Sequence, residues 1–283
     1  MDILSIENLF LIVLGLVWII GAVLQDLKRR EVDNLWNYSL IAFALAYRIA
    51  VSIFNGNYWF ILNGLIGLGI FFILHNLFYY GKLFAGGDAK LLLALGVILP
   101  LSYNWIVNLK IFGAFILLFL ITGSIYALIW ALCLVVANWK RFKKEFIKQW
   151  KDYRKMFFMA LGFVLLWTIL VFFIGQTGFI LIGLVVLLFP VLFVFSKSVE
   201  HTCMIKAVKP KKVTEGDWLY DDITVNGKKI KSSWHGVSKS QLSLIKSKAK
   251  GKILIKFGIP FTPSFLFGFL ALLFLVWKYG SWF

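Results

Sequence analysis

The stretch "YYGKLFAGGDAKLLLALG", residues 79–96, links the fold of this chain to a candidate functional residue. It places two glycines and the carboxylate of Asp88 at the start of an apolar helix. Asp88 is the only acidic residue between positions 34 and 144. An ionisable side chain among apolar segments costs free energy, so its presence indicates a function.

The composition around this stretch is that of a membrane protein. Of the 283 residues 61% are hydrophobic, and the mean hydropathy is +0.86, well above a soluble domain. Several apolar runs reach the roughly 20 residues that a bilayer crossing needs. We therefore expect an all-α polytopic membrane protein with about eight transmembrane segments, at 9–25, 36–54, 58–80, 89–101, 111–138, 156–174, 178–197 and 259–279.

The distribution of the +17 net charge predicts the orientation in the membrane. Lys and Arg gather at 28–30, 139–155 and 198–258, while the turns at 55–57 and 176–178 carry no charge. Basic loops stay in the cytoplasm. The chain is therefore predicted to cross the cell membrane several times, with both termini on the outside. Because the charge follows loops and forms no recognised module, a nucleic-acid partner is not expected.

Three basic residues fall outside these stretches. Arg48, Lys110 and Lys278 are expected to snorkel toward an interface. The stretch "GLIGLG" (64–69) lies in the third apolar segment, and its glycines are expected to allow close helix packing. They are Gly64, Gly67 and Gly69.

Three parts of the chain are predicted. Residues 1–197 form a membrane catalytic domain of about seven helices with a basic cytoplasmic loop at 139–155. Residues 198–258 form a small soluble cytoplasmic α+β unit, and 259–283 form the C-terminal transmembrane helix. The soluble unit is predicted from the hairpin signal Asn226-Gly227 and from a capping box that begins at Ser238.

A second carboxylate, Asp26, is expected at the same membrane depth as Asp88. Asp26 closes the first apolar segment on its cytoplasmic side, and Asp88 opens the fourth segment on that side. If these segments pack together, two carboxylates share one site, and their repulsion keeps one of them protonated. Such a pair can hydrolyse an amide by general acid–base catalysis, without a metal or another cofactor.

The neighbours of Asp88 fit this interpretation, although simpler ones exist. Gly86 and Gly87 are expected to allow unusual backbone shapes and close approach of a substrate strand. Lys90 is expected to help keep one aspartate ionised. Alternatively, Asp88 is only a helix N-cap, and Asp26 is only an interfacial partner of a nearby arginine.

Two stretches resemble the signature regions of a known family. "LQDLKRREVDNLWN" (24–37) and "AGGDAKLLLALG" (85–96) look like those of the prepilin and preflagellin peptidases, membrane aspartic proteases of the GxGD type. The resemblance covers roughly residues 10–100 and gives the catalytic places to Asp26 and Asp88. Gly87 and Lys90 match the motif, whereas Ala85 replaces its first glycine. The chain has no CxxC, so the resemblance is to the archaeal branch.

The resemblance also implies a substrate. Members of this family remove a short basic leader from archaellin or type IV pilin-like precursors at the cytoplasmic face of the membrane. On this reading such precursors are the partners of the chain, and the acids Glu31 and Asp33 would bind the leader's Lys or Arg.

Two other functions fit the same residues. A transporter would use Asp26 and Asp88 as a proton or cation site, although two acids near one surface suit transport less well than acids at the midplane. An assembly protein of a surface filament would carry both acids as interfacial residues only. Substitution of either aspartate separates these functions, because a peptidase loses all cleavage while a scaffold tolerates at least one change.

Overall fold

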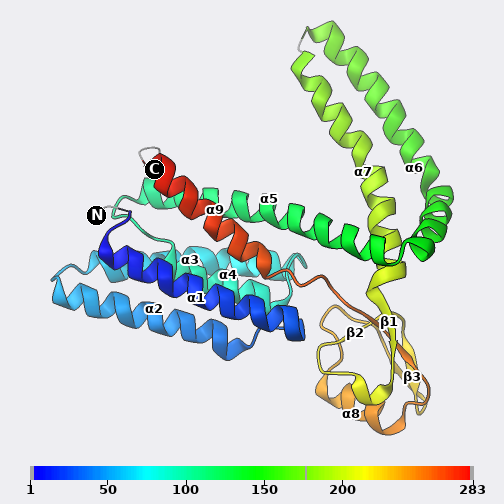
Figure 1. The fold of residues 1–283 in the computed structure, drawn as a ribbon, viewed down its shortest axis with the longest axis horizontal. Helices are drawn as coiled ribbons and strands as arrows, with labels where there is room; N and C mark the ends of the chain where they lie inside the picture. The colour runs from blue at the N-terminus through cyan, green and yellow to red at the C-terminus, as the bar shows by residue number, and fades with distance from the viewer. Residues whose placement is uncertain (1–2, 176, 281–283) are drawn as a thin grey trace. The chain divides into compact units, whose positions relative to one another are not determined.

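The computed structural model describes residues 3–175 and 177–280, which fall into two compact units, 1–129 with 259–283 and 130–258. The first unit is helical (Figure 1) and contains α1 (Ile6–Arg29), α2 (Asn34–Phe54), α3 (Trp59–Tyr80), α4 (Gly86–Ile98), most of α5 (Trp105–Ala137) and α9 (Pro263–Tyr279). The second contains the end of α5, then α6 (Trp139–Ile174), η1 (Thr177–Phe179), α7 (Ile180–Val199), η2 (Glu200–Met204), β1 (Ile205–Val208), η3 (Pro210–Lys212), β2 (Trp218–Leu219), β3 (Ile223–Val225), β4 (Lys228–Ile230), α8 (Lys239–Lys248) and β5 (Ile253–Lys256).

The helices confirm a polytopic membrane protein. Within the described residues, six helices are long and apolar enough to cross a bilayer, namely α1, α2, α3, α5, α6 and α7 with its η2 extension. Each of the eight predicted apolar segments contains a helix, but α4 has 13 residues and α9 has 17, so both are shorter than a full span. The predicted fold class holds, and residues 3–175 and 177–280 contain six rather than eight helices of spanning length.

The short helix α4 lies at the centre of the first unit. It packs against α1, α2 and α3, and almost every side chain from Ala89 to Ile98 is buried. A Cβ atom added to Gly67 of α3 would overlap the backbone oxygen of Gly96, so α3 and α4 touch through their backbones. The predicted packing role therefore holds for Gly67. A Cβ atom added to Gly69 would have no other atom within 4 Å, so Gly69 does not have this role.

Arg48 fixes the end of α4, and the expectation that it snorkels to an interface is wrong. Its side chain is fully buried. Nε donates to the Val97 oxygen at 2.9 Å, and Nη2 donates to the Pro100 oxygen at 2.7 Å. A helix C-terminus leaves carbonyl groups unpaired and carries a partial negative charge, so a buried guanidinium satisfies both needs. Arg48 therefore holds one end of α4 while Asp88 lies at the other.

Residues 139–155 of the second unit form the first half of α6 and not the predicted loop. The helix runs unbroken for 36 residues from this basic segment into the apolar segment that follows. The second compact unit begins within α5 at residue 130 and ends at residue 258, so it contains α6 and α7 as well as residues 198–258.

The rest of the second unit is the small α+β part that the sequence predicts. β5 lies between β1 and β2 in an antiparallel sheet, with Ile205 opposite Lys256. Asn226 and Gly227 have left-handed φ values of 51° and 76°, as the β3–β4 hairpin turn requires. Ser238 and Gln241 form the predicted capping box at the start of α8. Buried aliphatic side chains of these strands and of α8 form its core.

Candidate active site

Asp26 lies in the last turn of α1 and is 6% exposed. The helix ends at Arg29, and Arg30 then turns the chain with a left-handed φ of 59°. One carboxyl oxygen of Asp26, Oδ2, accepts a hydrogen bond from the backbone N–H of Thr262 at 3.0 Å. Because Thr262 immediately precedes α9, this bond ties the end of α1 to the start of a helix far along the chain.

Asp88 lies in the first turn of α4, and the same threonine contacts it. Thr262 donates its hydroxyl, Oγ1, to Asp88 Oδ1 at 3.0 Å. The N-cap of α4 is Ala85, so the interpretation of Asp88 as a simple N-cap is wrong. One residue therefore bridges the two aspartates, through its backbone to Asp26 and through its side chain to Asp88.

The local sequence explains why Thr262 is free to make this bridge. It is the N-cap of α9, with Pro263 at the first helical position, yet its hydroxyl makes no capping bond within the helix. The side chain is fully buried. Phe84, Phe119 and Phe261 pack on one another around this segment, with ring centroids 5.5 to 5.8 Å apart. Exclusion of water by such rings strengthens the hydrogen bonds that remain.

The environment of Asp88 favours its protonated form. The pKa of Asp88 is raised to about 7, first by burial and second by the nearby charge of Asp26, while the hydrogen bond from Thr262 lowers it. Asp88 belongs to α4, which is not one of the six candidate spans. Its carboxyl lies deep among protein atoms, although part of its surface stays accessible. Burial and the neighbouring carboxylate thus both favour a proton on Asp88.

The two glycines before Asp88 have ordinary backbone conformations, and their contribution is the absence of a side chain. Neither Gly86 nor Gly87 has a left-handed φ, so that expectation is wrong. A Cβ atom on Gly87 would lie 3.4 Å from the backbone of Val32, and the Gly87 oxygen accepts a hydrogen bond from Asn37 at 3.0 Å. On Gly86 a Cβ atom would meet only Tyr79, at 3.7 Å. Gly87 thus fits the start of α4 closely against the α1–α2 connection.

Lys90 points to α2 and not to the aspartates. Its ammonium group hydrogen-bonds to the side-chain oxygen of Asn34 and lies 5.9 Å from the centre of the Tyr38 ring. The structure therefore gives Lys90 a role in joining α4 to α2. It does not bring Lys90 into contact with Asp88, contrary to the expected support of an ionised aspartate.

Glu31 and Asp33 lie exposed on the connection between α1 and α2. Asp33 Oδ2 is 3.5 Å from Arg29 Nη1, and the backbone N–H of Asp33 donates to Gln25 at 2.9 Å. Among the described residues no hydrogen bond or ion pair joins either acid to Asp26 or Asp88. Their predicted part in binding a leader stays a prediction.

Sequence reasoning missed two polar residues of this site, Thr262 and Asn37. Both are fully buried, and both hydrogen-bond to residues that the sequence did single out. A buried amide in an apolar helix is a weak signal for Asn37. For Thr262 the signal is its place between Pro260 and Pro263, where the chain cannot continue a helix from before.

Comparisons with known proteins find similarity in the part of the chain that carries both aspartates. Residues 13–132 match the model of the type IV leader peptidase family. The chain is 29% identical over 93 residues to a preflagellin peptidase of Methanocaldococcus jannaschii, covering 32% of this chain and 38% of that protein. It is also 29% identical over 122 residues to a preflagellin peptidase of Methanococcus maripaludis, covering 40% of this chain and 52% of that protein.

These matches cover only part of this chain and part of each relative. The chain spans about half or less of the length of these two curated relatives, and Thr262 lies outside the matched segment. No solved structure matches the chain significantly. Residues 13–132, which match the type IV leader peptidase family, carry both Asp26 and Asp88.

Proposed function

We propose that this chain is a membrane-embedded aspartic endopeptidase. It removes short basic leader peptides from archaellin or type IV pilin-like precursors at the cytoplasmic face of the membrane. The observation that carries the proposal is the bridge by Thr262, which holds the carboxyls of Asp26 and Asp88 as a pair. The similarity to two preflagellin peptidases supports the choice of substrate class.

The pair provides the two groups that amide hydrolysis needs. The ionised carboxylate takes a proton from a water molecule as the water oxygen attacks the scissile carbonyl carbon. The protonated carboxyl transfers its proton to the carbonyl oxygen during the attack and takes it back when the carbonyl group re-forms. As the C–N bond breaks, the proton taken from water passes to the leaving nitrogen, so one water is consumed. Because the two carboxyls act as one pair, neither aspartate is assigned a fixed role.

In this mechanism Thr262 is a positioning residue. It occupies Asp26 Oδ2 and Asp88 Oδ1, which leaves the second oxygen of each carboxyl without a hydrogen bond to the described residues. Those two oxygens are the ones available to the water and to the scissile carbonyl. The hydroxyl donated to Asp88 also limits the rise of its pKa.

The acids of the α1–α2 connection provide a binding site for the leader. Glu31 and Asp33 are exposed and follow the helix that carries Asp26. The chain as a whole is strongly basic, which disfavours approach of a cationic leader at long range. Local carboxylates offset this repulsion for a Lys or Arg side chain near the site.

A cleavage assay tests the proposal. Detergent-solubilised protein is mixed with a precursor that has a short basic leader ending in glycine, and the product mass is followed. Wild-type protein is expected to release the leader, and Asp26→Asn and Asp88→Asn are each expected to abolish release. Each variant must elute and unfold like the wild type.

Two results would oppose the proposal. Cleavage that persists in either folded asparagine variant contradicts the two-aspartate mechanism. Absence of cleavage for every precursor tested, with folded wild-type protein, contradicts the peptidase function and directs the same variants to proton-flux assays.

A further inference from the structure

The first half of α6 has a large excess of positive charge. Residues 139–155 carry eight basic side chains and two acidic ones. All eight basic side chains are exposed. We call them the basic face, and they are Lys140, Arg141, Lys143, Lys144, Lys148, Lys151, Arg154 and Lys155.

These eight residues lie on one side of the helix. At about 100° per residue, their positions fall within an arc of about 160°. The opposite side carries apolar and aromatic residues that contact α7. Phe142 packs on Phe195 with ring centroids 5.6 Å apart, and Tyr153 packs on Phe193 at 5.1 Å. This packing fixes the rotation of α6 and turns the basic face away from α7.

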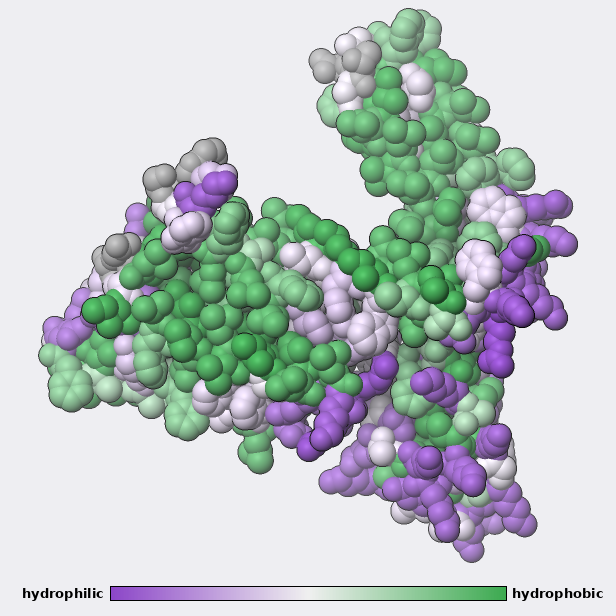
Figure 2. Space-filling view, viewed as in Figure 1, coloured by the Kyte–Doolittle hydropathy of each residue, from purple (hydrophilic) through white to green (hydrophobic). Residues whose placement is uncertain are grey.

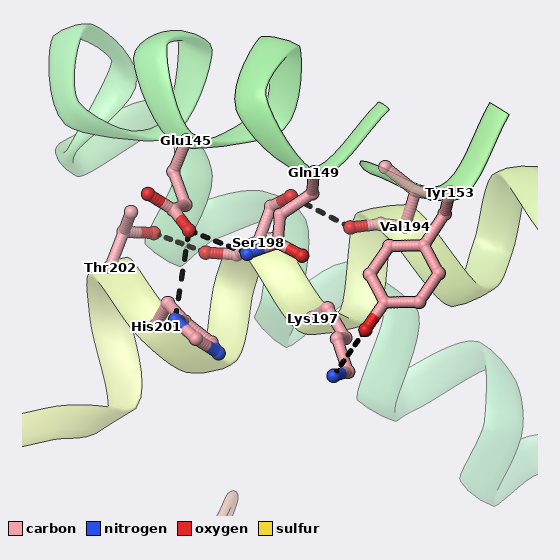
Figure 3. A network of polar contacts seen from close by, with 8 residues as sticks. All are labelled: Glu145, Gln149, Tyr153, Val194, Lys197, Ser198, His201 and Thr202. Atoms are coloured by element: carbon pink, nitrogen blue, oxygen red, sulfur yellow. Dashed lines mark hydrogen bonds and ion pairs between the residues drawn. The ribbon is translucent and has the colours of Figure 1, made fainter. Parts of the chain in front are cut away.

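A polar network beside this packing engages one of the two acids (Figure 3). Glu145 accepts a hydrogen bond from Gln149 at 2.7 Å and lies 3.6 Å from His201 Nδ1. Nearby, Lys197 donates to the Tyr153 hydroxyl at 2.9 Å. Glu145 therefore points toward α7 and η2 and does not neutralise the basic face.

The basic face keeps its charge unpaired. Among the described residues, none of its eight side chains forms an ion pair or a hydrogen bond. Other lysines of the same unit do find acids, since Lys229 pairs with Asp222 at 3.1 Å and Lys256 with Glu200 at 2.8 Å. The chain itself thus leaves this face open to an anionic partner.

The position of the face along α6 indicates which partner this is. A helix of 36 residues is about 54 Å long, whereas the hydrocarbon core of a bilayer is about 30 Å thick. Residues 156–174 supply the apolar half, with exposed large side chains such as Phe158, Leu166 and Phe173. Residues 139–155 therefore lie where the membrane meets water. Figure 2 shows this hydrophilic surface directly beside the hydrophobic surface of the α6–α7 hairpin.

A groove lies next to the basic face on its membrane side. It has a volume of about 500 Å³ and lies between α6 and α7, and Met156, Met159, Val186 and Pro190 are among its lining residues. Met156 directly follows Lys155, so the groove begins where the basic face ends. Its apolar lining suits a hydrocarbon chain and not a soluble anion or an acidic peptide.

We propose that the basic face of α6 binds the headgroups of anionic phospholipids, with an acyl chain in the adjoining groove. A helix that has one basic side and one apolar side, and that adjoins a membrane-spanning segment, is suited to the surface of a leaflet that contains anionic lipids. The attraction is electrostatic, so it weakens as salt increases. This proposal is independent of the peptidase activity, because it uses no residue of the aspartate site.

Lipid retention by the full chain tests this proposal. The protein is placed in nanodiscs of phosphatidylcholine with a minor fraction of phosphatidylglycerol, and native mass spectrometry counts the lipids that stay bound. The test variant combines Lys140→Gln, Lys144→Gln, Lys148→Gln and Lys151→Gln. A control variant makes the same change of net charge on and after α8, with Lys239→Gln, Lys246→Gln, Lys248→Gln and Lys250→Gln, all of them exposed.

We expect wild-type protein and the α8 control to retain phosphatidylglycerol in preference to phosphatidylcholine. In the α6 variant this preference should fall at least about tenfold, and arginine at the same four positions should restore it. Equal loss in both glutamine variants would overturn the proposal, because net charge alone would then explain retention. No preference in the wild type, or a preference that high salt leaves unchanged, would also overturn it.

Discussion

Replacement of Thr262 by valine removes one of the two bonds that hold the aspartates. Valine has nearly the shape of threonine and keeps the backbone N–H that donates to Asp26 Oδ2. It lacks the hydroxyl that donates to Asp88 Oδ1 at 3.0 Å. The variant therefore isolates the bond to Asp88 without opening a cavity.

The size of the effect follows from that bond. A hydrogen bond to a charged group contributes about 1.5–3 kcal/mol, and one pKa unit corresponds to about 1.4 kcal/mol. The hydroxyl favours the ionised form of Asp88, so its loss raises the pKa of Asp88 further above about 7, by roughly one to two units. Because Asp88 is also less well held, kcat should fall about tenfold or more.

The assay is the pH dependence of kcat and kcat/KM for leader removal. The limb of the profile that reports protonation of the aspartate pair should move to higher pH in Thr262→Val and return in Thr262→Ser. Ser264→Ala is the matched control, because Ser264 is also fully buried and its hydroxyl has no hydrogen-bond partner among the described residues. A Thr262→Val profile that superimposes on the wild type, or moves to lower pH, would refute the positioning role.

Three further sets of substitutions test other parts of the account. Arg48→Leu leaves several buried carbonyl groups unpaired and should lower stability by about 3 kcal/mol or more, so an unchanged thermal unfolding temperature in detergent would contradict its capping role. Gly67→Ala forces a Cβ atom against the Gly96 oxygen and should cost about 1–3 kcal/mol, whereas Gly69→Ala should be nearly neutral by the same measurement. Neutral amides at Glu31 and Asp33 should weaken cleavage of basic leaders selectively, and equal loss on neutral leaders would rule out direct leader binding.

The apolar segments and the aspartate positions were predictable because they depend on local pattern. Run length and Lys/Arg placement identify helices, and the absence of other acids singles out Asp88. The same holds for the turn at Asn226-Gly227, whose left-handed backbone is a property of those two residues. These features require no knowledge of what packs against them.

The remaining features depend on contacts between distant parts of the chain. Thr262 follows Asp88 by 174 positions, and the residues next to it in the sequence do not indicate that it contacts two carboxyl groups. Arg48 was expected at an interface, because a hydropathy pattern does not reveal that α4 ends beside it with free carbonyls. The helix at 139–155 was predicted as a loop from its charge, although Phe142 and Phe146 repeat at helical spacing.

The central claim is that Asp26 and Asp88 act as one catalytic unit, and a double-variant cycle on leader cleavage tests it most directly. kcat/KM is measured for the wild type, Asp26→Asn, Asp88→Asn and the double variant, each shown to be folded. If the two carboxyls share one proton transfer, each single change should remove nearly all activity and the double change should cost no more than either. Single losses that are partial and multiply in the double variant would show that the aspartates act independently, and would contradict the account.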